Sequence, residues 1–331
     1  MRRLAILFGG PSVEHDVSII SARSVYARVD RESFDPVLIG MTRDWQWVEG
    51  AQAESMVLGS GYEPSQRQLH DILGDLRPDV VFPLVHGTFG EDGNLQAWLQ
   101  SLGYPYVGCG VRASALGMDK AVSKALWAHH GLPVVPWRVL HRESWKSELD
   151  RFGNAIHAPV FVKPADSGSS VGISHVSALE ALPAAVESAF AISRKVMIEP
   201  AIKGRELEVA VLGGYTPDVV SVPGEIVPGS DFYDYDDKYV NNKAQVLVPA
   251  SLPEEVIAEA RRMAASAYTA VDAYGMARVD FFLDREKGLL LNEINTIPGF
   301  TPISMYPKLM EHSGISFTNL ITQLADLALL A

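Results

Sequence analysis

The chain has little cysteine, no long apolar run and a deficit of basic residues. A single cysteine among 331 residues, Cys109, excludes an internal disulfide and is typical of a reducing compartment. No activating base is evident beside Cys109, so we interpret it as a small packed residue rather than a nucleophile. The 28 basic and 40 acidic residues give a net charge of −12, which argues against broad binding to nucleic acid or anionic membranes.

The amino-terminal apolar run, residues 4–8, is too short for a signal core and meets Gly9-Gly10. It is therefore predicted to be a buried first strand, and a cytoplasmic protein without a membrane span is expected. The length and the 47% hydrophobic content predict a globular chain of two or three domains.

The first region alternates strand, helix and strand, at residues 4–8, 17–29 and 34–41, which predicts a βαβ unit and a parallel sheet. Ligands bind at the carboxyl ends of such strands. The loop after the first strand holds Glu14, which could accept a hydrogen bond from a substrate ammonium. In the alternative interpretation, Asp16 only caps the following helix and its polar neighbours are solvated.

A second loop of this kind follows the strand predicted at residues 79–85. It begins with His86 and continues with glycines that allow close approach to a ligand. A lone histidine there is more often structural than catalytic. Helices are predicted over residues 92–102 and 111–130, and Asp119 and Lys120 open a segment that ends at Gly131.

The middle region has an apolar strand that ends in Lys163, followed by a Gly/Ser loop and a strand at residues 171–176. Backbone N–H groups and serine hydroxyls in such a loop, here including Ser169 and Ser170, can bind phosphate oxygens. This is not a Walker motif, because the lysine precedes the loop. A desolvated ammonium nevertheless needs an anionic partner. A further strand ends at Glu199.

The last region begins with strands predicted at residues 207–213 and 219–226. A tyrosine- and charge-rich loop at residues 231–245 follows, and its length is typical of a lid. Ser251 and Glu254 fit a capping box that opens a long helix. A final helix is expected from about residue 317 to 330.

Two apolar runs within residues 277–300 flank a turn of about five residues and predict a β-hairpin. Strand side chains alternate faces, so Arg278 and Asp280 share one face, and Glu293 and Asn295 share another that antiparallel pairing can bring to the first. Such oxygen ligands suit Mg²⁺ and its bound phosphates. The alternative is a solvated charged face. The apolar runs favour burial, where unpaired carboxylates would be costly.

Taken together, these motifs resemble those of the D-alanine–D-alanine ligases, in the same order and over nearly the whole chain. The motifs are Gly9-Gly10, Glu14-His15-Asp16-Val17-Ser18, His86-Gly87, Gly90-Glu91-Asp92-Gly93, Met118-Asp119-Lys120, Val162-Lys163-Pro164, Gly168-Ser169-Ser170-Val171-Gly172, Phe232-Tyr233-Asp234-Tyr235, Lys238-Tyr239, Arg278-Val279-Asp280 and Asn292-Glu293-Ile294-Asn295-Thr296-Ile297-Pro298-Gly299-Phe300-Thr301.

The resemblance implies an α/β enzyme of three domains with the ATP-grasp fold, with expected boundaries at residues 1–118, 119–206 and 207–331. The first would be a parallel α/β domain, and ATP would lie between the other two. The resemblance also implies two Mg²⁺ (or Mn²⁺) ions, held by Asp280, Glu293 and Asn295. The residues implied to contact ATP are Lys120, Lys163, Ser169, Ser170, Glu199, Ile202, Glu206, Lys238, Asn292 and Glu293.

The implied reaction has two steps. ATP phosphorylates the carboxylate of one D-alanine, and the amine of a second D-alanine then attacks the acyl phosphate. By the resemblance, Arg278 and the Gly299 N–H would form the oxyanion hole, Glu14 and His86 would bind the first D-alanine, and Ser304 would bind the carboxylate of the second.

The resemblance further implies that Glu14, Ser169 and Tyr239 latch the lid. Family members that make D-alanyl-D-lactate commonly replace the lid tyrosine with histidine, so Lys238-Tyr239 favours the dipeptide product. Asn241-Asn242-Lys243 departs from the more acidic residues usual in the family. The closest alternative is a ligase that uses D-lactate or D-serine as second substrate. A nucleotide sensor without turnover would not need Arg278 and Ser304. A homodimer is expected.

Overall fold

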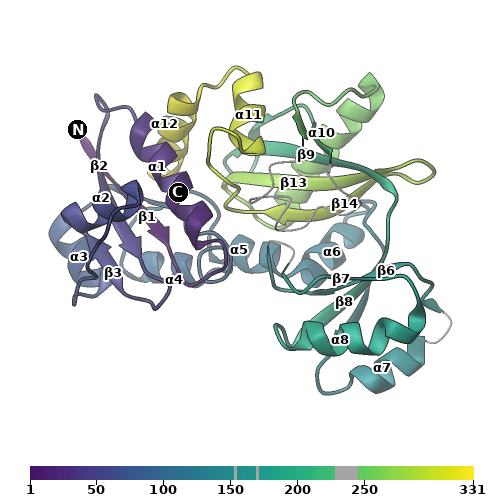
Figure 1. Ribbon diagram of the computed structural model, residues 1–331. Helices are drawn as coiled ribbons and strands as arrows, with labels where there is room; N and C mark the ends of the chain where they lie inside the picture. Colours follow the sequence, from purple (N-terminus) through teal and green to yellow (C-terminus); the bar gives the residue numbers. More distant parts are fainter. Residues whose placement is uncertain (153–154, 169–170, 228–244) are drawn as a thin grey trace.

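The computed structural model describes residues 1–152, 155–168, 171–227 and 245–331, which form three sheets with helices packed on them (Figure 1). Ser169, Ser170, Lys238 and Tyr239 lie outside the described residues, as does almost all of the predicted lid. No helix of the described segments is long and apolar enough to cross a membrane.

The first sheet has the strand order β3-β2-β1-β4, and β1 pairs in parallel with both of its neighbours while β3 is antiparallel. Side chains of β1 alternate between two cores: Ile6 packs with α1 and α2, and Leu7 packs with α3 and α4. Burial on both faces explains the unbroken apolar run of this strand. The elements are β1 (Arg2–Gly9), α1 (His15–Arg28), β2 (Phe34–Met41), β3 (Trp47–Glu49), α2 (Gly50–Leu58), α3 (Leu69–Leu76), β4 (Val80–Pro83) and α4 (Asn94–Ser101).

The helix predicted at residues 111–130 is two helices, α5 (Val111–Met118) and α6 (Lys120–His129). Asp119 interrupts them with an extended backbone, and its carboxylate accepts hydrogen bonds from the N–H groups of Ala121 and Val122. Satisfying these otherwise unpaired donors starts a new helix at Lys120.

The second sheet is antiparallel, with the order β5-β8-β6-β7. The helices α7 and α8 were not anticipated from the sequence. The elements are β5 (Arg138–His141), α7 (Trp145–Phe152), β6 (Val160–Pro164), β7 (Ser174–Val176), the short 3₁₀ helix η2 (Leu179–Ala181), α8 (Leu182–Phe190) and β8 (Lys195–Pro200).

The third sheet runs β12-β11-β9-β13-β14, with β10 paired to β9. The strand predicted at residues 219–226 is divided between β10 and β11. The predicted capping box is wrong: Pro253, not Ser251, precedes α10, and no side chain caps it. The elements are β9 (Gly204–Gly213), β10 (Pro217–Val220), β11 (Gly224–Val227), β12 (Gln245–Leu247), α10 (Glu254–Ala270), β13 (Gly275–Asp284), β14 (Gly288–Asn295), α11 (Met305–His312) and α12 (Phe317–Ala328).

The predicted hairpin is β13 and β14, and its register places Arg278 opposite Asn295 and Asp280 opposite Glu293. The turn is shorter than expected, because Asp284 pairs with Gly288 and leaves three residues between them. A register shift directly after Asp280 leaves Asn292 as the extra residue of a bulge.

The carboxyl-terminal helix α12 lies beside α1, although the two are at opposite ends of the chain (Figure 1). Leu320 and Leu324 belong to the same buried core as Phe8 of β1. Arg2 pairs with Asp326 at 2.6 Å, which ties β1 to α12. Helix α12 therefore completes the apolar core on one face of the first sheet.

Candidate active site

The first part of the site is a lysine cluster, which we define as Lys120, Lys124, Lys163 and Glu199. Helix α6 supplies the first two lysines and β6 and β8 supply the other residues. Lys120 Nζ donates to the carbonyl of Ser167 at 2.7 Å. The same nitrogen lies 3.3 Å from Oε2 of Glu293 on β14, so α6 connects the Gly/Ser loop to the hairpin.

Glu199 lies between two lysines and is 4% exposed. Its Oε2 is 2.6 Å from Lys163 Nζ, and its Oε1 is 2.9 Å from Lys124 Nζ. Burial alone would raise the pKa of Glu199, but the two ammonium groups outweigh it and lower that pKa. The strand pairing of β6 with β8 sets Lys163 and Glu199 close together. The sequence reasoning missed Lys124; its position four residues after Lys120 was the available signal.

The hairpin face carries Arg278 and Asp280 in a bidentate contact: Nε donates to Oδ1 at 2.8 Å and Nη2 donates to Oδ2 at 2.7 Å. Arg278 Nε also lies 3.1 Å from Glu208 on β9, a residue that the sequence reasoning did not single out. Burial opposes the charge of Arg278, but Asp280 and Glu208 dominate and raise its pKa. The guanidinium is thus a fixed cation beside the predicted metal ligands.

The hairpin residues fit a divalent cation by their donor chemistry. Asp280 and Glu293 are cross-strand neighbours, and Asn295 adds an amide whose Oδ1 accepts from the Ile297 N–H at 3.0 Å. Buried Oδ1 of Asn292 has no hydrogen-bond partner among the described residues. These are hard oxygen donors of the type that Mg²⁺ prefers. In the described part of the chain, no group of three or more His, Cys, Asp or Glu side chains that could hold a metal is found.

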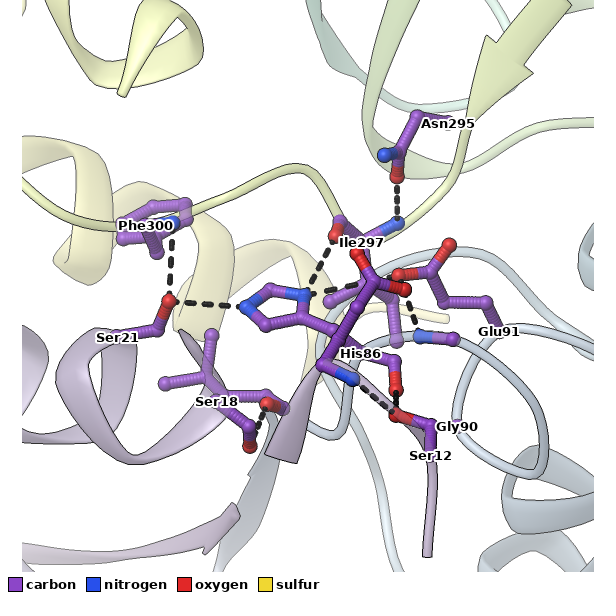
Figure 2. Close-up of polar contacts among 12 residues, drawn as sticks. Ser12, Ser18, Ser21, His86, Gly90, Glu91, Asn295, Ile297 and Phe300 are labelled. Carbon is purple, nitrogen blue, oxygen red and sulfur yellow. Dashed lines mark hydrogen bonds and ion pairs between the residues drawn. The ribbon is translucent and has the colours of Figure 1, made fainter. Parts of the chain in front are cut away.

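The second part of the site is the His86 network, which we define as Ser12, Ser21, His86 and Glu91 with the backbone groups that they contact (Figure 2). His86 Nε2 lies 2.9 Å from Ser21 Oγ, and its Nδ1 lies 3.0 Å from the Ile297 carbonyl and 3.6 Å from Glu91. Because a carbonyl only accepts, Nδ1 carries the proton.

Burial would lower the pKa of His86, but the hydrogen bond and charge of Glu91, together with the charge of Glu14, raise it. Ser12 Oγ donates to the His86 carbonyl at 2.6 Å, and Ser21 Oγ accepts from the Phe300 N–H at 3.3 Å. The network therefore joins the loop after β1 to the segment after β14. The sequence reasoning did not single out Ser12, Ser21 or Glu91.

Glu14 lies where three loops meet. It is the residue before α1, and neither it nor Asp16 caps the helix with its side chain; Asp16 instead pairs with Arg43 at 3.1 Å. A Cβ at Gly87 would lie 2.8 Å from Glu14 Oε2, and one at Gly168 would lie 3.4 Å from it. The glycines thus allow the loops to approach this carboxylate.

Gly299 and Ser304 are close to each other after the hairpin. A Cβ at Gly299 would lie 2.9 Å from Ser304 Oγ, so a larger residue would collide with the hydroxyl. Ser304 precedes α11, and its Oγ accepts from the Thr301 N–H at 3.1 Å. Ile202 lies half-buried in the connection between β8, which holds Glu199, and β9; Glu206 lies half-buried on β9.

Two family models match this chain: residues 3–109 match that of the D-ala D-ala ligase N-terminus, and residues 126–326 match that of the D-ala D-ala ligase C-terminus. The chain is a member of the D-alanine–D-alanine ligase family. A D-alanine--D-alanine ligase of Prosthecochloris aestuarii is 43% identical, over 99% of this chain and 98% of its own. One from Chlorobium phaeovibrioides is 45% identical, over 98% and 96%.

Solved structures of the ligase family share the fold. The VanG D-Ala:D-Ser ligase from Enterococcus faecalis has a TM-score of 0.88 and 33% identity, covering 99% of both chains. The D-alanine-D-alanine ligase from Coxiella burnetii has a TM-score of 0.82 and 36% identity, covering 99% of this chain and 94% of its own. The resemblance found in the sequence is confirmed, as is the α/β ATP-grasp fold with its amino-terminal parallel sheet.

Proposed function

We propose that this protein joins two D-alanines at the expense of ATP, for the synthesis of peptidoglycan precursors. The observation that carries the proposal is full-length similarity to D-alanine--D-alanine ligases at 43–45% identity. The lysine cluster and the His86 network, which the β13–β14 hairpin connects, support it. The proposed domains span residues 1–118, 119–206 and 207–331.

At the amino-acid end, we assign the ammonium of the first D-alanine to Glu14, with His86 nearby. Arg278 and the Gly299 N–H would stabilise the oxygen that becomes negative when the second amine attacks the acyl phosphate. Preorganised donors of this kind act where water is excluded, and they need no rearrangement during the reaction. Ser304 would hold the second carboxylate. Glu14 would also act with Ser169 and Tyr239 in closing the lid.

At the nucleotide end, Lys120 and Lys163 would bind phosphates, which suits buried ammonium groups that are held by carboxylates. The remaining nucleotide contacts are assigned to Ser169, Ser170, Glu199, Ile202, Glu206, Lys238, Asn292 and Glu293. Asp280, Glu293 and Asn295 would hold Mg²⁺ or Mn²⁺. The bound metal supplies neutralisation of phosphate charge during phosphoryl transfer.

The deciding experiment measures phosphate release from ATP and Mg²⁺, with and without D-alanine, followed by product analysis. We expect D-alanine-dependent release and D-alanyl-D-alanine as the product. The absence of D-alanine dependence would overturn the proposal. Offering D-serine or D-lactate together with D-alanine, near neutral pH, tests the second substrate; a mixed product in excess would favour the alternative ligase.

Two finer proposals rest on family membership: a cytoplasmic location, where ATP and the precursors are available, and a homodimer. Sedimentation at micromolar concentration measures the second directly. A single species with the 36.1 kDa mass of one chain would exclude the dimer.

A further inference from the structure

Lys124 is fully buried on α6, one turn after Lys120. Residues four apart on a helix are neighbours, and two like charges there repel each other. Each ammonium is balanced by a carboxylate from a different sheet: Glu293 of β14 for Lys120, and Glu199 of β8 for Lys124. The helix thus presents paired charges to both sheets that flank it.

Glu199 has each carboxylate oxygen next to a different ammonium, Lys124 at 2.9 Å and Lys163 at 2.6 Å. All three side chains are less than a tenth exposed. Two cations and one anion leave this buried group with one excess positive charge. A buried charge without a counter-charge is costly, so the group is suited to receive an anion.

We infer that Lys124 is a positioning residue for the ATP phosphates: by occupying one oxygen of Glu199, it leaves the charge of Lys163 incompletely neutralised and available to a phosphate. This inference rests on the proposed function, because it takes Lys163 as a phosphate ligand. Without Lys124, Glu199 and Lys163 would form a neutral pair that competes with the nucleotide.

The state of the amine agrees with this role. Burial, with help from Lys163, lowers the pKa of Lys124 to about 8, while Glu199 opposes the shift. The ammonium is therefore the main form at neutral pH. Lys124 Nζ lies 2.9 Å from Glu199 Oε1, and the charge and hydrogen bond of that carboxylate favour the ammonium form.

The test compares Lys124→Met and Lys124→Gln with the wild-type protein, by calorimetric titration with ADP and Mg²⁺ and with adenosine. A unit charge at this range is worth about tenfold in affinity. We expect ADP to bind about tenfold more weakly and adenosine to bind as before. Both variants keep Glu199 paired with Lys163, and the glutamine can still donate to Glu199, so at least one folded variant is expected. Lys195→Met is the matched control, since Lys195 pairs with Asp119 at the start of the same helix.

Comparing ADP with adenosine separates charge from packing, because only ADP carries phosphates and a packing defect would weaken both ligands equally. ADP affinity within twofold of wild type in both variants, or equal losses for ADP and adenosine, would each overturn the inference. Wild-type turnover with D-alanine is measured alongside, so failure of the proposed function is seen separately.

Discussion

The lysine cluster and the His86 network are built in opposite ways. The cluster consists of side-chain ion pairs, in which Glu199 balances only one of two lysines. The network consists mainly of hydrogen bonds to backbone, including the carbonyl groups of His86 and Ile297. Its one carboxylate, Glu91, faces its single histidine. The cluster thus carries an excess positive charge, whereas the network pairs one carboxylate with one histidine.

This difference indicates how one site can hold two unlike substrates. Ion pairs can exchange partners, so an arriving phosphate can take over a lysine without breaking backbone structure. Hydrogen bonds to backbone fix geometry, which an amino acid needs if its carboxylate is to lie in line for transfer. The hairpin lies between the two, with Arg278 and Asp280 in mutual contact.

The largest expected effect comes from a substitution in the hairpin that lies between the lysine cluster and the His86 network. Asp280→Asn removes the charge that is predicted to hold a metal and that also pairs with Arg278. We expect kcat to fall by about 10³-fold, comparable with the loss of a preorganised catalytic donor, as measured by D-alanine-dependent phosphate release. Thermal unfolding provides the control for folding. An active Asp280→Asn, or an active Glu293→Ala, would contradict the metal assignment.

The second effect tests the ion pairs of the cluster. Glu199→Gln leaves Lys124 and Lys163 without their shared anion, and we expect a loss of about 3 kcal/mol in the free energy of unfolding. Because the folded-state pKa of Glu199 is lowered, its contribution is present above the unfolded value near 4.5 and is lost as the pH falls. Urea unfolding at pH 7 measures the loss.

Lys124→Met is the matched comparison for this stability effect. It leaves a balanced pair, so we expect it to lose clearly less stability than Glu199→Gln. Equal losses in the two variants would show that the charges are not what stabilises the cluster.

The third effect lies in the network. His86→Gln removes the ring that connects Ser21 to the Ile297 carbonyl. We expect KM for D-alanine to rise about tenfold, because the proposed amino-acid site loses its fixed geometry, with little change in KM for ATP. Steady-state kinetics with each substrate varied separately measure this. A rise confined to the KM for ATP would contradict the assignment of the His86 network to D-alanine.

The raised pKa of His86 also sets a pH dependence of stability. A raised folded-state pKa contributes stability below the unfolded value of about 6.5, and this contribution is lost as the pH rises through the folded value. Urea unfolding at pH 6 and pH 8 should show this loss in the wild-type protein and a smaller one in His86→Gln. An equal loss of unfolding free energy between pH 6 and pH 8 in the two proteins would contradict a raised pKa of His86.

The smallest effect is expected at Cys109, which lies in the core shared by α5 and the third sheet. Burial raises the pKa of its thiol to about 12, so almost no thiolate exists at pH 8. We expect Cys109→Ala to retain activity within about twofold, and the native protein to resist alkylation. Rapid labelling with loss of activity would contradict a purely structural role.

Elements with strong local sequence patterns could be predicted from the sequence. The alternating hairpin predicted that Asp280 and Glu293 would meet, because a strand period of two and a short turn leave little freedom. The β1–α1–β2 unit was predicted for the same reason. A segment that begins at Asp119 and Lys120 was predicted, but local patterns did not reveal that Asp119 breaks the helix expected over residues 111–130. They also did not reveal that Pro253 displaces a predicted cap.

Contacts between segments that are distant in the sequence were not predicted. The pairing of Lys124 with Glu199 depends on how α6 lies against the second sheet, and that of Ser21 with the Phe300 N–H depends on how the last region lies against the first. No sequence period encodes such contacts. Residue roles at Ser169, Ser170, Lys238 and Tyr239 lie outside the described residues and stay predictions.

The position of α12 has a consequence for how the protein is made. Domains generally fold in order as the chain leaves the ribosome, at about 5–20 residues per second. The first sheet emerges early, but α12, which shares its core, is translated only after the strands of the other two sheets. The core that α12 shares with β1, α1 and α2 therefore stays incomplete for on the order of 20 s. Exposed apolar surface makes an incomplete chain prone to aggregation, so a truncation that removes α12 is expected to leave this core incomplete and the protein aggregation-prone.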